Sequence, residues 1–148
     1  MKKISVLIPC YNEEENVVPI SEAVIGIITK ELPQYDYELV FIDNDSTDKT
    51  SELLRMLCAK NPKIKAIFNA RNFGQFNSPY YGILQVTGDC VISMVADLES
   101  VPGVWCASYF AGMPWVDCAQ GGSSIVISGV GDKRPGVKAA VGLGRRIW

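Results

Sequence analysis

Three short stretches decide the fold of this chain: VLIPCYNEE at residues 6–14, VFIDNDSTD at residues 40–48 and VISMVADLE at residues 91–99. Each begins as an apolar, largely β-branched run and ends in polar or acidic residues. Such a run, bounded by residues that favour turns, is typical of a strand buried in a parallel sheet. Groups just past the carboxyl ends of these strands line the ligand crevice of an open α/β sheet. We therefore expect a tyrosine, an asparagine and several carboxylates at one edge of a sheet.

Extended and helical segments alternate along the first 95 residues. The pattern predicts strands over residues 4–9, 37–42, 64–69 and 90–95. It predicts helices from the acidic stretch 12–16 to about residue 31, from the capping residues 45–48 to about residue 60, and near residues 80–86. Strands and helices that alternate at this spacing favour right-handed βαβ units. The expected fold is therefore α/β, with a mainly parallel, Rossmann-like sheet.

Composition excludes several classes of function. The chain has 148 residues and a net charge of −2, so no basic field indicates a nucleic-acid partner. It contains no histidine, which excludes Ser-His-Asp and Cys-His catalysis, and its five cysteines form no CxxC pair for zinc. No stretch approaches the roughly 18 apolar residues of a spanning helix, and the amino terminus is a first strand rather than a signal peptide.

The character of the chain changes after Glu99. All three tryptophans and nine of the thirteen glycines lie beyond residue 100, and no glutamate does. We therefore expect one domain over residues 1–100 and an irregular tail over residues 101–148. Our hypothesis is that this tail is not the native continuation but the product of a frameshift, a rearranged gene end or divergence. A small divergent subdomain is the alternative, and translation of the other reading frames of the gene distinguishes the two.

Four stretches in this order resemble the family 2 glycosyltransferases, which have the GT-A fold: IPCYNEE at 8–14, IDNDSTD at 42–48, RNFGQ at 71–75 and ADLE at 96–99. The similarity covers residues 3 to about 100 and is closest to the branch that passes a sugar from a nucleotide to a polyprenyl phosphate. It implies a truncated GT-A domain, an inverting and metal-dependent transfer, a UDP- or GDP-linked sugar, and a polyprenyl phosphate as one acceptor. It also implies a role in cell-envelope synthesis and a cytoplasmic place, peripheral at the inner face of the membrane.

The resemblance assigns donor binding to residues at the ends of the first three strands, namely Pro9, Tyr11, Glu13, Asp43, Asp45 and Arg71. An aromatic ring such as Tyr11 can stack on a nucleobase. Asp43, at a strand end rather than in the core, can accept a hydrogen bond from an N–H on a base edge. The planar guanidinium of Arg71 suits a phosphate or a base carbonyl. The alternatives are a surface tyrosine in a turn, carboxylates that only cap a helix, and a solvated loop arginine.

Asp97 and Glu99 follow the strand at 90–95. Two carboxylates at i and i+2 project to one side of a strand, and their oxygens suit Mg²⁺ or Mn²⁺ that also binds a diphosphate. The resemblance assigns them to the metal, while two exposed loop acids are the alternative. No residue is assigned as a catalytic base.

Two other functions compete with the glycosyltransferase interpretation. The first is a remnant that binds nucleotide but transfers nothing, which metal-dependent binding without turnover would indicate. The second is a dinucleotide-dependent oxidoreductase, disfavoured because no glycine fingerprint follows the first strand.

Overall fold

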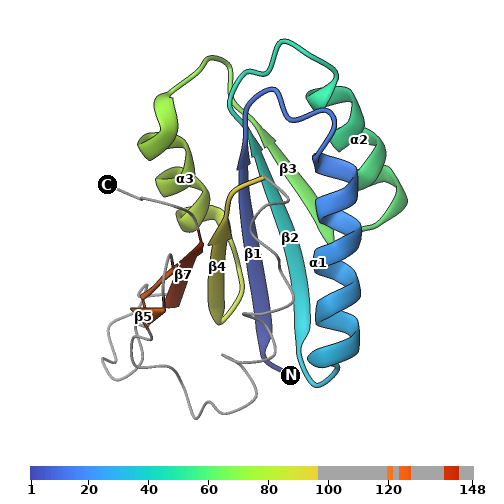
Figure 1. Ribbon diagram of the computed structural model, residues 1–148, viewed down its shortest axis with the longest axis vertical. Coiled ribbons are helices and arrows are strands. Elements are labelled where there is room, and N and C mark those ends of the chain that lie inside the picture. The colour runs from blue at the N-terminus through green and yellow to red at the C-terminus, as the bar shows by residue number, and fades with distance from the viewer. Residues whose placement is uncertain (97–119, 122–123, 128–138, 144–148) are drawn as a thin grey trace.

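The computed structural model describes residues 1–96, 120–121, 124–127 and 139–143 (Figure 1). Its strands are β1 (Lys3–Cys10), β2 (Asp36–Asp43), β3 (Ile64–Phe68), β4 (Cys90–Met94), β5 (Gln120–Gly121), β6 (Ser124–Ile127) and β7 (Ala139–Leu143). Its helices are α1 (Val17–Glu31), α2 (Thr50–Lys60) and α3 (Gly74–Gln85). The described strands form one sheet in the order β3-β2-β1-β4-β7-β6-β5. Within these residues, no helix has the length and the apolar character needed to cross a membrane.

The first four strands confirm the predicted parallel sheet. β1 lies between β2 and β4 and runs parallel to both, and β2 runs parallel to β3. The register aligns Cys10 with Asp43 and Asp43 with Phe68, so β1, β2 and β3 end at the same level. This common level gives the sheet a carboxyl edge, where the loops after these strands meet.

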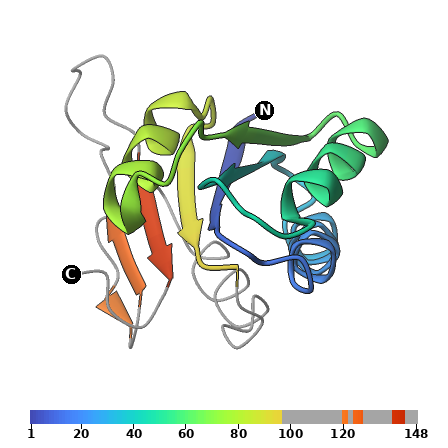
Figure 2. The same ribbon diagram turned by 90° about the horizontal axis from the view of Figure 1, so that it is seen from above.

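Helices cover both faces of the sheet (Figure 2). α1 and α2 pack on the larger core, which takes alternate strand residues such as Val6, Ile8 and Phe41. α3 lies on the other face, over a smaller core that contains Leu7 and Val40. Because successive strand side chains point to opposite faces, the continuous apolar runs of the sequence are those of a sheet covered on both sides.

Helix α3 begins at Gly74, earlier than the predicted segment near residues 80–86. Pro79 lies inside it and Gly82 in its second half. Both residues disfavour a helix locally, so the sequence did not predict the full helix that tertiary packing supports. A Cβ atom on Gly82 would lie 2.0 Å from Cδ1 of Ile42 and 2.8 Å from Cδ1 of Leu7. Glycine at this position therefore lets the helix lie close on β1 and β2.

The starts of α1 and α2 also differ from the prediction. The acidic residues after Asn12 do not form the first turn of α1, because the helix begins at Val17 and they occupy a preceding turn. Asp45 and Ser46 do not cap α2, which begins at Thr50. In the loop just before this helix, Asp48 is the acceptor, and its Oδ1 receives the N–H of Thr50 at 2.9 Å.

The described parts of the tail are extended strands rather than irregular chain. β7 pairs in parallel with β4, and β6 and β5 follow in antiparallel pairing. An uncovered edge of β4 would leave a row of backbone N–H and C=O groups unpaired, and β-branched residues such as Ile125, Val126 and Val141 favour strands. The expected domain boundary at residue 100 lies outside the described residues.

A buried carboxylate joins three strands near the amino edge of the sheet. Glu38 of β2 is 1% exposed and accepts hydrogen bonds from Ser5 Oγ at 2.6 Å and from Lys65 Nζ at 2.6 Å. The backbone N–H of Thr87 also donates to it at 2.6 Å, and Lys3 Nζ lies 3.2 Å from its Oε2. We call Lys3, Ser5, Glu38, Lys65 and Thr87 the Glu38 cluster.

Electrostatics in the Glu38 cluster keep the carboxylate ionised. Burial on its own raises the pKa of Glu38, because the charged form loses its hydration. The hydrogen bonds from Lys65, Ser5, Thr87 and Lys3 outweigh that effect, and the pKa of Glu38 lies well below its usual value. The cluster is therefore a charge-compensated element of the fold.

Candidate nucleotide-binding site

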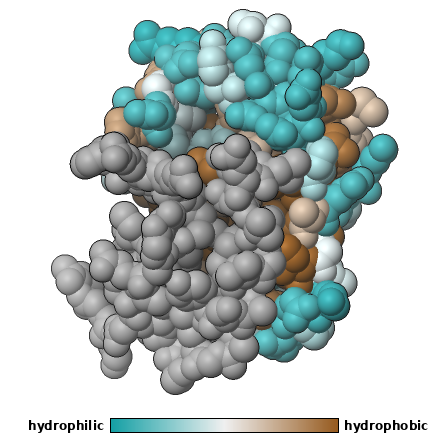
Figure 3. All heavy atoms as spheres, in the orientation of Figure 1, coloured by the Kyte–Doolittle hydropathy of each residue, from teal (hydrophilic) through white to brown (hydrophobic). Residues whose placement is uncertain are grey.

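Three loops meet at the carboxyl edge of the sheet. The first follows β1 (residues 11–16), the second follows β2 (residues 44–49) and the third follows β3 (residues 69–73). They lie together at the top of the molecule in Figure 1, and Figure 3 shows that this end is mostly hydrophilic. The predicted meeting of the ends of stretches 6–14 and 40–48 is therefore found, and the loop after β3 joins them. The acidic end of the third predicted stretch, residues 97–99, lies outside the described residues.

Asn12 holds the first loop against the second. Its Oδ1 accepts the N–H of Thr47 at 2.8 Å, and its own N–H donates to Ser46 Oγ at 2.9 Å. The N–H of Glu13 donates to Thr50 Oγ1 at 2.8 Å. Asn12 has a φ of 54°, in the left-handed region that asparagine tolerates better than most residues. Asn12 is thus the asparagine expected at this edge, and its role is to join the two loops.

Asn44 holds the second loop against the third. Its Nδ2 donates to Asn72 Oδ1 at 2.9 Å and to the carbonyl of Gly74 at 3.4 Å. Its Oδ1 accepts the N–H of Phe73 at 2.9 Å and the Nδ2 of Asn69 at 3.0 Å. Asn44 belongs to the IDNDSTD stretch, but the motif alone predicts no function for it. An asparagine directly after a buried strand, followed by a turn, is the only signal that pointed to it.

The predicted donor-binding residues of the first loop differ in exposure. Pro9 is half-buried in β1, opposite Ile42. Tyr11 is 49% exposed, which leaves its ring open to a ligand. Glu13 is half-buried, and its Oε2 accepts a hydrogen bond from Asn16 Nδ2 at 2.7 Å. Of these three, Tyr11 is therefore the most open for stacking.

Asp43 is more deeply buried than a strand-end position suggested, with 2% of its surface exposed. Its Oδ1 accepts the N–H of Ser46 at 3.1 Å, and its Oδ2 accepts a short hydrogen bond from the hydroxyl of Ser51. The expectation that it lies outside the core needs correction, because the turn and the start of α2 enclose it. Asp45, the next acid along, is exposed and has a φ of 66°.

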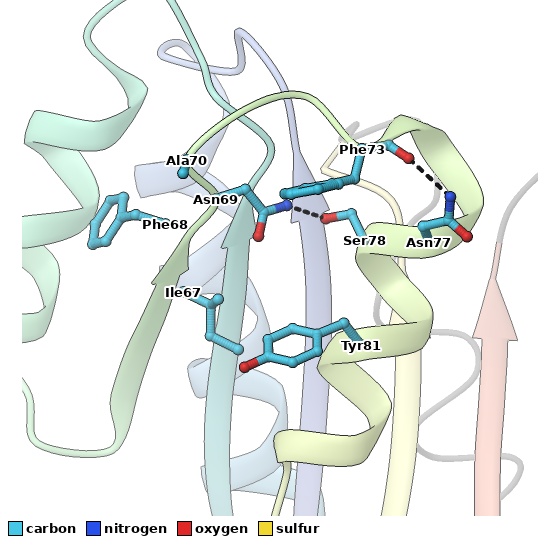
Figure 4. A pocket seen from close by; sticks show the side chains of 8 residues that line it. All are labelled: Ile67, Phe68, Asn69, Ala70, Phe73, Asn77, Ser78 and Tyr81. Atoms are coloured by element: carbon cyan, nitrogen blue, oxygen red, sulfur yellow. Dashed lines mark hydrogen bonds between the residues drawn. The ribbon is translucent and has the colours of Figure 1, made fainter.

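Arg71 is exposed in the third loop, with its guanidinium carbon 4.9 Å from the centre of the Phe73 ring. A hollow of about 440 Å³ opens between β3 and α3, beside this loop (Figure 4). The hollow is lined by Ile67, Phe68, Asn69, Ala70, Phe73, Asn77, Ser78 and Tyr81. None of the predicted donor-binding residues lines it, but Phe73, over which Arg71 lies, does.

Charges at the carboxyl edge are mostly acidic. Burial, together with nearby Asp43 and Glu13, raises the pKa of the Cys10 thiol far above its usual value, so Cys10 is no nucleophile. Burial also raises the pKa of Asp48, but hydrogen bonds from Thr50 outweigh this effect and the net pKa is lowered. Asp48 therefore stays ionised at neutral pH.

The predicted metal ligands, Asp97 and Glu99, lie outside the described residues. Within the described part of the chain, no three histidine, cysteine or acidic side chains come together in a way that could hold a metal ion. The donor set itself, two carboxylates directly after β4, has the hard oxygen chemistry that Mg²⁺ and Mn²⁺ accept. The metal site therefore remains a prediction.

Comparisons with other sequences identify close relatives. The family model described as "Glycosyl transferase family 2" matches residues 5–121, which extends past the limit near residue 100 set from motifs. An undecaprenyl-phosphate 4-deoxy-4-formamido-L-arabinose transferase from Photorhabdus laumondii is 41% identical over 104 residues. The enzyme of the same name from Yersinia enterocolitica is 38% identical over 104 residues. Each match covers 69% of this chain and 31% of the relative, so the chain spans about a third of their length.

Solved structures share the fold. The mannosyltransferase PcManGT from Pyrobaculum calidifontis, in complex with GDP-Man and Mn²⁺, aligns with a TM-score of 0.56 and 20% identity over 65% of this chain and 28% of its own. TarS from S. aureus, in complex with UDP-GlcNAc, aligns with a TM-score of 0.52 and 26% identity over 64% of this chain and 27% of its own. Both alignments agree with an α/β, Rossmann-like sheet of the GT-A fold.

Proposed function

Because this chain belongs to glycosyl transferase family 2, we propose that it forms the donor-binding part of a glycosyltransferase. The donor is a nucleotide sugar linked to UDP or GDP, and the acceptor is a polyprenyl phosphate. The observation that carries the proposal is the joining of three loops at the carboxyl edge, with Tyr11 and Arg71 exposed on two of them. In an open α/β sheet this edge is where ligands bind.

The chemistry follows from the two substrates. A phosphate oxygen of the acceptor attacks the anomeric carbon of the donor sugar, the bond to the nucleoside diphosphate breaks, and the configuration inverts. Because a lipid phosphate is already ionised, this attack requires no strong general base, in agreement with the absence of histidine. A polyprenyl acceptor also places the protein at the inner face of a membrane, in the synthesis of the cell envelope.

Each donor-binding residue has a role within this proposal. Tyr11 stacks on the base, and Arg71 binds a phosphate or a base carbonyl through its planar guanidinium. Asp43, whose oxygens are engaged by Ser46 and Ser51, shapes the base pocket and reads the base only through a small rearrangement. Pro9, Glu13 and Asp45 complete the rim. Asp97 and Glu99 would hold Mg²⁺ or Mn²⁺, and the bound ion would neutralise charge on the diphosphate leaving group.

Binding measurements test the proposal. Calorimetry with UDP-GlcNAc and GDP-mannose is expected to show binding of one of them that tightens when Mn²⁺ is added. The variant Asp97→Asn should lose most of that gain, and Glu99→Gln should lose less because glutamine keeps an oxygen donor. Binding that ignores both EDTA and Asp97→Asn would contradict the metal role. Absence of binding to either donor would contradict the proposal as a whole.

A nucleotide-binding segment without transfer activity is the second candidate. This chain spans 31% of a named transferase, so transfer is tested on this segment itself. Transfer of radiolabelled sugar to undecaprenyl phosphate distinguishes the two candidates. Donor binding with no transfer would favour the second.

A further inference from the structure

The side chain of Asn44 uses all of its hydrogen-bonding capacity on the third loop and on Gly74, the first residue of α3. Both protons of Nδ2 and both lone pairs of Oδ1 have partners, and Asn44 is only 7% exposed. Two partners are backbone groups whose roles are fixed: the N–H of Phe73 can only donate, and the carbonyl of Gly74 can only accept. Residue 44 must therefore present a donor and an acceptor on one planar group. Among side chains of this size, only asparagine does so.

These contacts lie on both sides of Arg71. Asn69 precedes it, and Asn72 and Phe73 follow it, so the backbone of the loop is fixed before and after the arginine. The side chain of Arg71 is itself exposed. Its place at the carboxyl edge therefore depends on the loop that carries it. If the loop were free, ordering it would subtract from any affinity that Arg71 supplies.

We propose that Asn44 is a positioning residue for nucleotide binding, which acts by holding the 69–74 segment so that Arg71 faces the donor. Asn44 is linked to β1 as well, because its backbone N–H donates to the carbonyl of Cys10 at 3.0 Å. The residue thus connects the strand that precedes Tyr11 to the loop that carries Arg71. This inference rests on the proposed donor site, and it assigns the geometry of that site to a residue that touches no ligand.

A double-mutant cycle tests whether Asn44 acts through Arg71. Asn44→Ala and the isosteric Asn44→Asp should each weaken binding of the better of UDP-GlcNAc and GDP-mannose by about tenfold, equivalent to about 1.4 kcal/mol. In an Arg71→Ala background, either change should have almost no further effect. A change that merely loosens the fold would weaken both backgrounds equally. Additive losses, or an unchanged affinity in both single variants, would overturn the proposal.

The Asn44→Asp variant tests whether a loss of affinity comes from a packing void. It preserves the volume and the oxygen that accepts from Phe73, but it turns an acceptor toward Asn72 Oδ1 and the Gly74 carbonyl. A loss in this variant therefore cannot come from a packing void. Asn61→Ala is the matched control, because Asn61 also bonds a backbone N–H, that of Lys63, at 3.0 Å but at the amino edge. Its donor affinity should equal that of the wild type.

Amide hydrogen exchange supplies a readout that needs no ligand. The N–H of Phe73 should be protected in the wild type and in Asn61→Ala, and should exchange at least about tenfold faster in Asn44→Ala, because one hydrogen bond is lost. Unchanged protection of Phe73 would overturn the loop-holding role. If the wild type binds neither donor while Phe73 responds as expected, the proposed function fails and this inference fails with it. If the wild type binds a donor and the Asn44 variants bind it with the same affinity, this inference alone fails.

Discussion

The two edges of the sheet use polar side chains in opposite ways. At the amino edge, the Glu38 cluster sets one buried carboxylate against two lysines, so that charge and hydrogen bonds are compensated within the protein. At the carboxyl edge, hydrogen bonds also join the loops, but the acids have no cation within ion-pair distance in the described residues. The ion pairs of the described residues all lie away from the carboxyl edge, at Lys3–Glu38, Lys65–Glu38, Lys63–Asp36 and Lys30–Glu31.

This difference shows how one sheet separates stability from binding. A buried charge persists only when it is paired and hydrogen-bonded, as in the Glu38 cluster, whereas uncompensated groups and exposed rings keep capacity for a ligand. The carboxyl edge also carries two non-glycine residues with positive φ, Asn12 and Asp45. Strained backbone of this kind is frequent where function constrains a loop. Substitutions at the two edges should therefore have different signatures.

The largest expected effect is at the amino edge. Glu38→Ala leaves Lys3 and Lys65 without their buried partner and removes the acceptor for Ser5 and Thr87. We expect a loss of about 3 kcal/mol in the free energy of unfolding, at the lower end for a buried pair because both lysines reach solvent. Urea denaturation measures it. Glu15→Ala, an exposed change in the first loop, is the control and should stay within about 0.5 kcal/mol of the wild type. Similar losses of unfolding free energy in both variants would contradict the structural role of the Glu38 cluster.

The next largest effect concerns the contribution of Asp43 to stability. Asp43→Ala removes the acceptor for the Ser46 N–H and the Ser51 hydroxyl inside a buried turn, which should cost about 2 kcal/mol of stability. Asp43→Asn keeps one oxygen acceptor and should lose less. Thermal unfolding compares the two variants. A wild-type melting temperature for Asp43→Ala would show that this carboxylate has no structural role and is wholly available to a ligand.

Acid should act mainly through the Glu38 cluster. The pKa of Glu38 is lower in the folded than in the unfolded protein, so its contribution is complete above the unfolded value of about 4.3 and is lost as the pH falls toward the folded value. Between pH 5 and pH 3 the wild type should lose up to about 1.5 kcal/mol through this group. Denaturation followed by circular dichroism at both pH values should show that the free energy of unfolding depends less on pH in Glu38→Gln than in the wild type. The same reduction should be smaller in Asp48→Asn. Equal slopes for the wild type and Glu38→Gln would contradict the assignment.

The smallest effect concerns Asp45. Glycine adopts a φ of 66° without strain, so Asp45→Gly should stabilise the protein by about 0.5 kcal/mol after the entropy of the unfolded chain is counted. Asp45→Ala should destabilise it by a similar amount. Both variants lack the carboxylate, so donor affinity should fall equally in both if Asp45 contacts the nucleotide. Different affinities would mean that the loop conformation, rather than the charge, matters for binding.

The four parallel strands, their common carboxyl edge and the membership of the family are predictable from the sequence alone. Apolar β-branched runs can hardly be placed except in a buried sheet, and polar residues at their ends follow from that placement. The start of α3 was not predictable, because Pro79 and Gly82 disfavour a helix locally and only the fit of Gly82 against Leu7 and Ile42 accounts for it.

Which polar groups face each other depends on the packing of the folded chain and cannot be predicted from the sequence. Nothing in the sequence paired Glu38 with Lys3 and Lys65, or Asn44 with the segment around Phe73, because these contacts join residues 25 or more positions apart. For the same reason the depth of Asp43 was misjudged: a strand end is open or closed according to the loop that folds over it. Local pattern fixes the path of each strand, whereas burial and hydrogen bonding depend on neighbours that the packing of the whole sheet selects.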